Sequence, residues 1–136
     1  MVERVKTGIS GCDELIQGEF NRNSINLVSG GTGTGTTLFS LAFILNGAMK
    51  FKEKGIFFTI QESEADIKGD MEAVGLDYKS AAQNLTFMHC PPYETPSFLS
   101  LLQKMLAKIK PKRVVIDSIS SLAMPLENNV ERRKEM

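Results

Sequence analysis

Short apolar runs alternate along this chain with longer segments in which apolar residues recur every three or four positions. A short, mostly apolar run without strict alternation is typical of a strand that is buried on both faces. Runs of this kind predict strands at residues 25–28, 55–60 and 85–90, and a fourth strand within residues 112–118. The fourth begins with two basic residues and ends in Asp117 and a serine.

The segments between these runs have the spacing of amphipathic helices. Apolar residues lie three or four positions apart in residues 38–49, 64–75 and 98–109, which marks one buried face of each helix. Gly75 is placed to end the second helix, and Pro111 follows the end of the third. Strands that alternate with helices predict an α/β fold with a mainly parallel sheet, built as one domain over residues 1–136.

The amino-acid composition is typical of a globular domain and excludes several other classes of protein. The chain is 42% hydrophobic and 24% charged with a formal net charge of zero, which suits a globular domain. A net charge of zero provides no general attraction to nucleic acid, so we do not expect nucleic acid as a partner. The apolar stretch at residues 38–49 is too short to cross a bilayer, and residues 1–6 lack the apolar core of a signal peptide. Cys12 and Cys90 form no C-x-x-C pair, so we expect free thiols and a cytoplasmic protein.

A glycine-rich octet follows the first predicted strand and precedes the first predicted helix. This strand, loop and helix order is the context of a P-loop, whose pattern is G-x-x-x-x-G-K-S/T. Glycines allow the backbone N–H groups to surround a phosphate, and the helix N-terminus adds partial positive charge. The alternative is a glycine-rich turn that binds nothing. The candidate phosphate-binding residues are Gly30, Gly31, Thr32, Gly33, Thr34, Gly35, Thr36 and Thr37.

One position of the octet departs from the pattern. Thr36 occupies the place of the P-loop lysine, whereas Thr37 supplies the usual hydroxyl ligand of Mg²⁺. At an effective dielectric near 20, two unit charges about 4 Å apart interact by about 4 kcal/mol. Desolvation opposes part of this energy, but even half of it exceeds a tenfold change in affinity. We therefore expect weakened nucleotide binding and a larger loss of phosphoryl transfer.

Polar residues follow two of the predicted strands. Asp117 ends an apolar, β-branched run, which is typical of an aspartate that holds Mg²⁺ in P-loop proteins. Gln61 and Glu62 follow the strand at residues 55–60, and ligands bind at the carboxyl ends of parallel strands. The alternative for Glu62 is a plain connection to a helix that is capped by Ser63.

The segment Arg4–Ile16, RVKTGISGCDELI, resembles the opening signature of KaiC-like ATPases of the RecA/RadA superfamily. That signature reads T-G-I-x-G-x-D-E-L-x-x-G-G, and the match ends at Glu19, where the family has a second glycine. The order of the later motifs is also similar, so the resemblance spans roughly residues 4–122. It implies a three-layer P-loop NTPase that binds ATP or ADP with Mg²⁺ and assembles as a homo-oligomer, a hexamer in the family.

The resemblance also assigns roles to residues. It implies that the glycines of the octet bind phosphate and that Thr37 and Asp117 hold Mg²⁺. The family's strand after the P-loop helix ends in a pair of glutamates, the first of which activates the attacking nucleophile. Gln61 occupies the first place and Glu62 the second, and neighbouring strand residues point to opposite faces. Thr36 stands in place of the family's lysine, and Gln61 stands in place of its first glutamate. We therefore expect an ATP-binding domain with impaired or absent ATPase activity.

The family's sheet places one further strand between the P-loop strand and the strand that ends in Asp117. That strand follows the aspartate strand in sequence, so we expect the C-terminal half of the core to be missing from residues 1–136. Two alternatives to an impaired ATPase remain open. One is an interaction or oligomerisation module that keeps the fold without nucleotide. The other is an active ATPase completed by a partner subunit.

Overall fold

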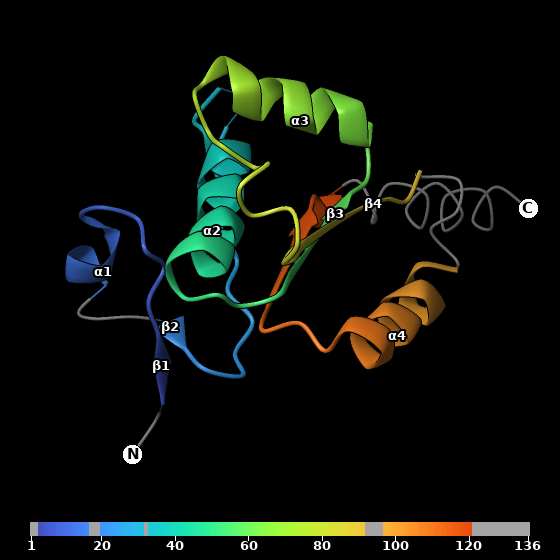
Figure 1. Ribbon diagram of the computed structural model, residues 1–136, viewed down its shortest axis with the longest axis horizontal. Coiled ribbons are helices and arrows are strands. Elements are labelled where there is room, and N and C mark those ends of the chain that lie inside the picture. The colour runs from blue at the N-terminus through green and yellow to red at the C-terminus, as the bar shows by residue number, and fades with distance from the viewer. Residues whose placement is uncertain (1–2, 17–19, 32, 92–96, 121–136) are drawn as a thin grey trace, which may run out of the picture.

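The protein folds around a parallel sheet with helices on both of its faces (Figure 1). Among the residues that the structure describes, the sheet has the strand order β4-β3-β5. Its strands are β4 (Leu85–His89), β3 (Gly55–Thr59) and β5 (Arg113–Asp117). Both pairings are parallel. The computed structural model describes residues 3–16, 20–31, 33–91 and 97–120.

In the described part of the chain, three helices form the outer layers. Helices α2 (Thr36–Lys50) and α3 (Glu64–Ala73) pack on one face of the sheet, and α4 (Phe98–Ile109) packs on the other. The N-terminal region adds β1 (Arg4–Val5) and β2 (Phe20–Asn21), which pair antiparallel, together with the short helix α1 (Cys12–Leu15). This three-layer arrangement confirms the α/β fold that the sequence predicts.

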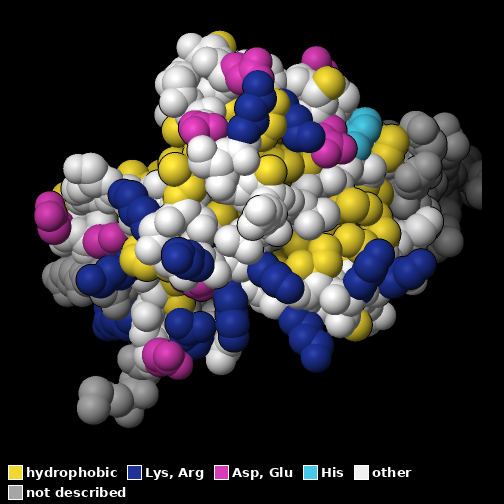
Figure 2. All heavy atoms as spheres, viewed as in Figure 1, with side chains coloured by type: hydrophobic (Ala, Val, Ile, Leu, Met, Phe, Trp, Pro, Cys, Tyr) yellow, Lys and Arg dark blue, Asp and Glu magenta, His cyan; other side chains and the backbone are white. Residues whose placement is uncertain are grey.

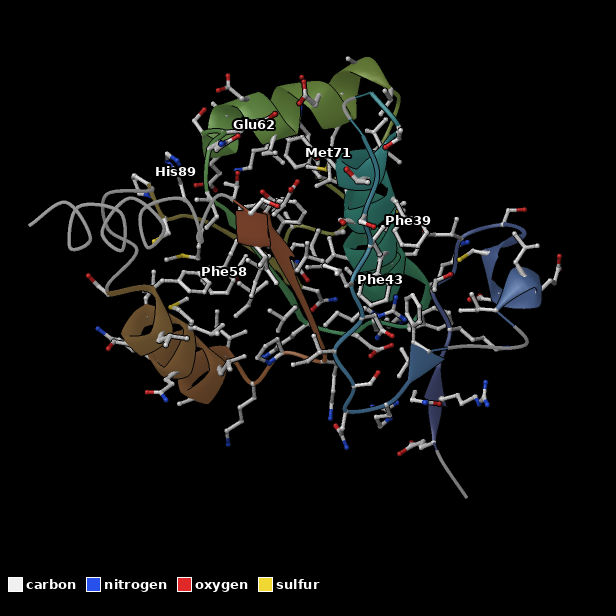
Figure 3. All side chains as sticks on the ribbon, turned by 180° about the vertical axis from the view of Figure 1, so that it is seen from behind. Phe39, Phe43, Phe58, Glu62, Met71 and His89 are labelled. Atoms are coloured by element: carbon white, nitrogen blue, oxygen red, sulfur yellow. The ribbon has the colours of Figure 1, made fainter. Side chains whose placement is uncertain are left out.

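The central strand β3 carries the core on both of its faces. Phe57 and Phe58 are neighbours in sequence, so they point to opposite faces, and both are fully buried. Burying one such side chain contributes about 1.5–3 kcal/mol. The cluster around Phe57 includes Met71, which points from α3 toward α2 (Figure 3). The cluster around Phe58 includes Phe98 of α4, whose ring meets that of Phe58 edge-on at 5.4 Å.

The helix boundaries agree with the local signals in the sequence. The Ser63 side chain caps α3 by accepting a hydrogen bond from the Asp66 amide at 3.2 Å. Gly75 has a positive φ of 78° just after that helix, a conformation that glycine adopts without strain. Helix α4 occupies residues Phe98–Ile109, the range that the apolar spacing predicts.

The predicted strand at residues 25–28 is wrong. These residues form no strand, and the side chains of Ile25 and Leu27 are 96% and 80% exposed. The physical reason is that a strand needs a neighbour for its backbone groups. In the described part of the sheet, β5 pairs only with β3 and so brings no partner strand next to residues 25–28.

Arg113 connects the N-terminal segment to the layer of α2. Its side chain is only 1% exposed, and its guanidinium donates to the backbone carbonyls of Lys6, Thr7 and Phe43. The guanidinium carbon also lies 4.6 Å from the centre of the Phe43 ring and 5.2 Å from that of Phe51. The bonds to Lys6 and Thr7 join residues that are 107 and 106 positions apart, so they fix the two ends of the described chain against each other.

The Thr7–Asp13 turn lies in the signature segment and is held by a second set of contacts. A carboxylate oxygen of Asp13 accepts from the Thr7 amide at 2.9 Å and from its hydroxyl at 2.8 Å. Helix α2 reaches the same turn, because Asn46 and Lys50 donate to the Gly8 carbonyl. The signature segment therefore has a structural role in this chain, which is to anchor the N-terminal region on α2.

No helix in the described ranges is long and apolar enough to cross a membrane. Cys12 is half-buried and Cys90 is buried, and neither forms a disulfide bond.

Candidate functional site

The glycine-rich loop leads directly into the first turn of α2. Gly35 is the N-cap residue of this helix with φ of 88°, and Gly33 has φ of 82°. Residues that carry a side chain rarely adopt this left-handed backbone conformation, so both positions favour glycine. The sequence predicts the position of this loop correctly, and Thr32 lies outside the described residues.

Thr34 shapes the loop from within. Its hydroxyl donates to the Gly31 carbonyl at 2.7 Å, and its amide donates to the same carbonyl at 3.2 Å. A Cβ atom at Gly30 would lie 2.3 Å from the Thr34 hydroxyl oxygen, whereas a Cβ at Gly31 would meet open space. The first glycine of the pattern is thus required by packing within the loop.

The N-terminus of α2 has the features of an anion site. Gly35 offers no side-chain cap, and the first turn of α2 contains no acidic residue. By contrast, α3 has both the Ser63 cap and two acidic residues in its first turn. Because the first amides of a helix have no partner inside the helix, those of α2 are available to a phosphate group.

The structure brings together the two residues that the sequence predicts as Mg²⁺ ligands. The Thr37 hydroxyl donates to a carboxylate oxygen of Asp117 at 2.8 Å. Asp117 is the last residue of β5, so the carboxyl end of that strand lies against the start of α2. Mg²⁺ in nucleotide sites takes one or two protein oxygens and completes its shell with phosphate oxygens and water. Thr37 and Asp117 fit this requirement.

Gln61 and Glu62 lie in a bend after β3, which ends at Thr59. Strand alternation therefore does not turn these two side chains to opposite faces, as the sequence had predicted for strand residues. The Thr59 hydroxyl donates to the Glu62 carbonyl at 2.8 Å and so holds the bend. Gln61 is exposed. Figure 3 shows Glu62 beside the start of α3, at the end of the sheet where the candidate site lies.

Glu62 belongs to a group of acidic residues that sequence reasoning overlooked. Partial desolvation raises the pKa of the Glu62 carboxyl, although the residue keeps contact with solvent, and the negative charges of Asp70, Asp117 and Asp66 raise it further. Glu62, Asp66 and Asp70 line one side of an open hollow of about 430 Å³. The available signal was the four-residue spacing of Asp66 and Asp70, because it places these two side chains on one face of α3, next to Glu62.

Thr36 is the first residue of α2 and is half-buried. A lysine at this position of a P-loop reaches the terminal phosphates, and threonine provides only a short neutral hydroxyl. The glycine-rich loop and the start of α2 thus offer backbone amides and hydroxyl groups to an anion, but they offer no fixed cation at position 36.

A glycine-rich loop at the start of a helix, next to an aspartate at the end of a parallel strand, defines a P-loop α/β domain of the RecA-like kind. A family model described as the KaiC ATPase matches residues 5–136. The chain belongs to this family.

Individual relatives agree with this assignment. A UPF0273 protein of Pyrococcus horikoshii is 31% identical over 141 residues, covering 90% of this chain and 57% of the relative. The circadian clock oscillator protein KaiC of a Nostoc species is 34% identical over 134 residues, covering 96% of this chain and 26% of the relative. A crystal structure of a KaiC-like protein of Pyrococcus horikoshii superposes with a TM-score of 0.83 at 37% identity, covering 91% of this chain and 57% of that one.

The chain therefore spans about half the length of the archaeal relatives it matches and about a quarter of the clock protein.

Proposed function

We propose that this domain binds ATP or ADP with Mg²⁺ at the loop of residues 30–37 and hydrolyses ATP slowly or not at all. The observation that carries the proposal is the hydrogen bond between Thr37 and Asp117, which aligns the two metal ligands beside the uncapped start of α2. Family membership supports nucleotide as the ligand. The loop amides would bind the phosphates, and the two side-chain oxygens would hold the metal.

Two departures from the family's sequence pattern support slow ATP hydrolysis. Thr36 cannot provide the charge that stabilises the terminal phosphates in the transition state. Gln61 can orient a water molecule, but it cannot accept a proton from it. Glu62 can accept a proton, and its raised pKa places it closer to the working range of a general base. We assign water positioning to Gln61 and the remaining base function to Glu62.

Isothermal titration with Mg-ATP and Mg-ADP tests the binding step. We expect weak binding to the natural chain and binding at least tenfold tighter to Thr36→Lys, because the added charge would face the phosphates. Ser40→Ala serves as the control, since it removes a hydroxyl from the same helix one turn beyond the loop. Absence of binding at millimolar nucleotide in both the natural chain and Thr36→Lys would refute the proposal.

Phosphate release tests the chemical step. If Thr36→Lys gains turnover, the missing lysine alone limits the natural chain. If Thr36→Lys binds ATP but gains no turnover, and the double variant Thr36→Lys/Gln61→Glu does, then Gln61 is the second cause. If neither variant turns over while both bind, hydrolysis needs residues outside this chain, which is the arrangement of an ATPase completed by a partner subunit.

Assembly and location form a separate part of the proposal. We infer a cytoplasmic homo-oligomer, a hexamer by family resemblance. Light scattering coupled to size-exclusion chromatography, with and without Mg-ATP, tests the assembly. A monomer under both conditions would contradict it without affecting the nucleotide proposal.

A further inference from the structure

Five lysines from two distant parts of the chain surround one hollow at the amino ends of β3 and β5. Figure 2 shows Lys and Arg side chains gathered along the lower edge of the molecule. The hollow is open, has a volume of about 510 Å³ and is also lined by Glu53 and Ile109. We call this cavity the lysine hollow. Its lysines are Lys52, Lys54, Lys108, Lys110 and Lys112.

The backbone brings these lysines together. Lys54 and Lys112 immediately precede the neighbouring strands β3 and β5, and the Lys112 amide donates to the Lys54 carbonyl at 2.8 Å. Lys52 and Lys110 both have a positive φ, of 53° and 54°, in the turns that enter these strands. Lys108 lies in the last turn of α4. The cluster is therefore a consequence of the strand register.

The charges of this cluster are not neutralised nearby. Within the described ranges, each ion pair of the structure involves a different cation from these five. The one carboxylate that the described residues contribute to the hollow, that of Glu53, lies 3.4 Å from the Arg113 guanidinium and is directed to that buried group. All five lysines are exposed. A concave surface lined by one sign of charge concentrates ions of the opposite sign.

The chemistry of the hollow favours a phosphate polymer over a protein surface. Lysine is depleted at protein interfaces, whose buried centres are apolar, and among the described residues only Ile109 brings an apolar side chain to this hollow. The same residues bring no aromatic ring on which a base could stack. What they offer is a set of cations on flexible stems, which pair with phosphate groups without regard to sequence.

We propose that the lysine hollow binds a chain of linked phosphate groups, either the backbone of a single-stranded nucleic acid or inorganic polyphosphate. The zero net charge of the whole chain concealed this surface, because it averages the lysines with acidic residues at the other end of the strands. The hollow lies at the amino ends of β3 and β5, whereas Asp117 and Glu62 lie at or just after their carboxyl ends. Binding here is thus independent of the nucleotide site.

Fluorescence anisotropy with a labelled oligo(dT) of about 15 nucleotides measures this binding. The test variant is Lys110→Asn/Lys112→Gln, since asparagine tolerates a positive φ. The control is Lys6→Gln/Lys79→Gln, which removes two exposed lysines outside the hollow. We expect affinity to fall with salt, and the slope of log K against log salt to lose roughly 0.7 for each hollow lysine removed. The control and Thr37→Val should keep the slope of the natural chain.

Unlabelled competitors identify the source of the phosphates. Each competitor displaces the labelled oligo(dT), and its concentration is counted in phosphate groups. If polyphosphate displaces the probe at a lower concentration than unlabelled oligo(dT) does, the result supports polyphosphate as the ligand. The reverse order supports nucleic acid. Equal competition by poly-glutamate of the same charge overturns the proposal in favour of an acidic protein segment. The proposal also fails if both double variants bind alike, or if neither phosphate polymer binds. If the test variant unfolds in urea earlier than the control, Lys52→Asn/Lys54→Gln repeats the measurement from the other segment.

Discussion

The Thr37 hydroxyl and the Asp117 carboxylate are 80 positions apart in the chain and 2.8 Å apart in the structure. This hydrogen bond fixes the start of α2 against the end of β5, although residues 25–28 before the loop join no strand. The position of the glycine-rich loop is therefore set from its C-terminal side, through the packing of α2 on the sheet. The N-terminal side of the loop contributes little to it.

Replacing Thr37 by valine should separate metal binding from phosphate binding. The valine keeps the shape of the side chain but removes the hydroxyl that we propose as a metal ligand, so we expect affinity for Mg-ATP to fall about tenfold, which is roughly 1.4 kcal/mol. Affinity for ATP in EDTA should stay the same, because the loop amides are intact. Titration calorimetry measures both, with Ser40→Ala as the control. Equal losses with and without Mg²⁺ would show that Thr37 shapes the loop and does not hold a metal.

Two adjacent glycines of the loop should respond differently to alanine. In Gly30→Ala the new methyl group would lie 2.3 Å from the Thr34 hydroxyl oxygen, so the loop must rearrange. In Gly31→Ala the methyl group meets open space. We expect Gly30→Ala to lose nucleotide binding by about tenfold or more and Gly31→Ala to keep it. The prediction is wrong if the two variants titrate alike.

Arg113 should be among the most sensitive positions for stability. Arg113→Met leaves three backbone carbonyls and the Glu53 carboxylate without this donor, at a cost of about 2–4 kcal/mol. Arg113→Lys should recover only part of this loss, because an ammonium group cannot reproduce the planar fork. Urea unfolding measures both, with Lys112→Met as an exposed neighbour that should change stability little. A loss in Arg113→Met no larger than in Lys112→Met would contradict the role of Arg113 as an anchor.

Glu62 should make the protein less stable as pH rises. Desolvation and then the charges of Asp70, Asp117 and Asp66 raise the pKa of its carboxyl in the folded state above its ordinary value of 4.5. The folded state thus holds this proton more tightly, so stability falls as pH rises from about 4.5 through the folded-state pKa. Glu62→Gln cannot ionise and should be more stable than the natural chain above that window and similar below it.

Urea unfolding across roughly pH 4 to 8 on both chains checks this prediction. Glu14→Gln removes a carboxylate on α1, far from this acidic group in sequence, and serves as the control for the loss of one charge. A stability gain in Glu62→Gln that is constant across the pH range would rule out ionisation as its cause.

Sequence patterns predicted most of the sheet and its helices because those signals are local. The spacing of apolar residues in 98–109 and the capping serine at position 63 depend on neighbours within a few residues. The predicted strand at residues 25–28 was wrong because a strand depends on a partner from elsewhere in the chain, which no local pattern reports. Strand alternation does not fix the direction of Glu62 for a related reason, since β3 ends at Thr59, where its pairing with β4 and β5 ends.

By itself, the sequence determined the α/β class, the family and the order of the motifs, because apolar periodicity and the glycine loop are written in consecutive residues. The tertiary structure alone decided which distant residues meet. It placed Thr37 on Asp117, packed Arg113 against Phe43 and Phe51, and gathered five lysines at one end of the sheet. The reason is that parallel strands align residues by register, and register is fixed by packing across the whole domain.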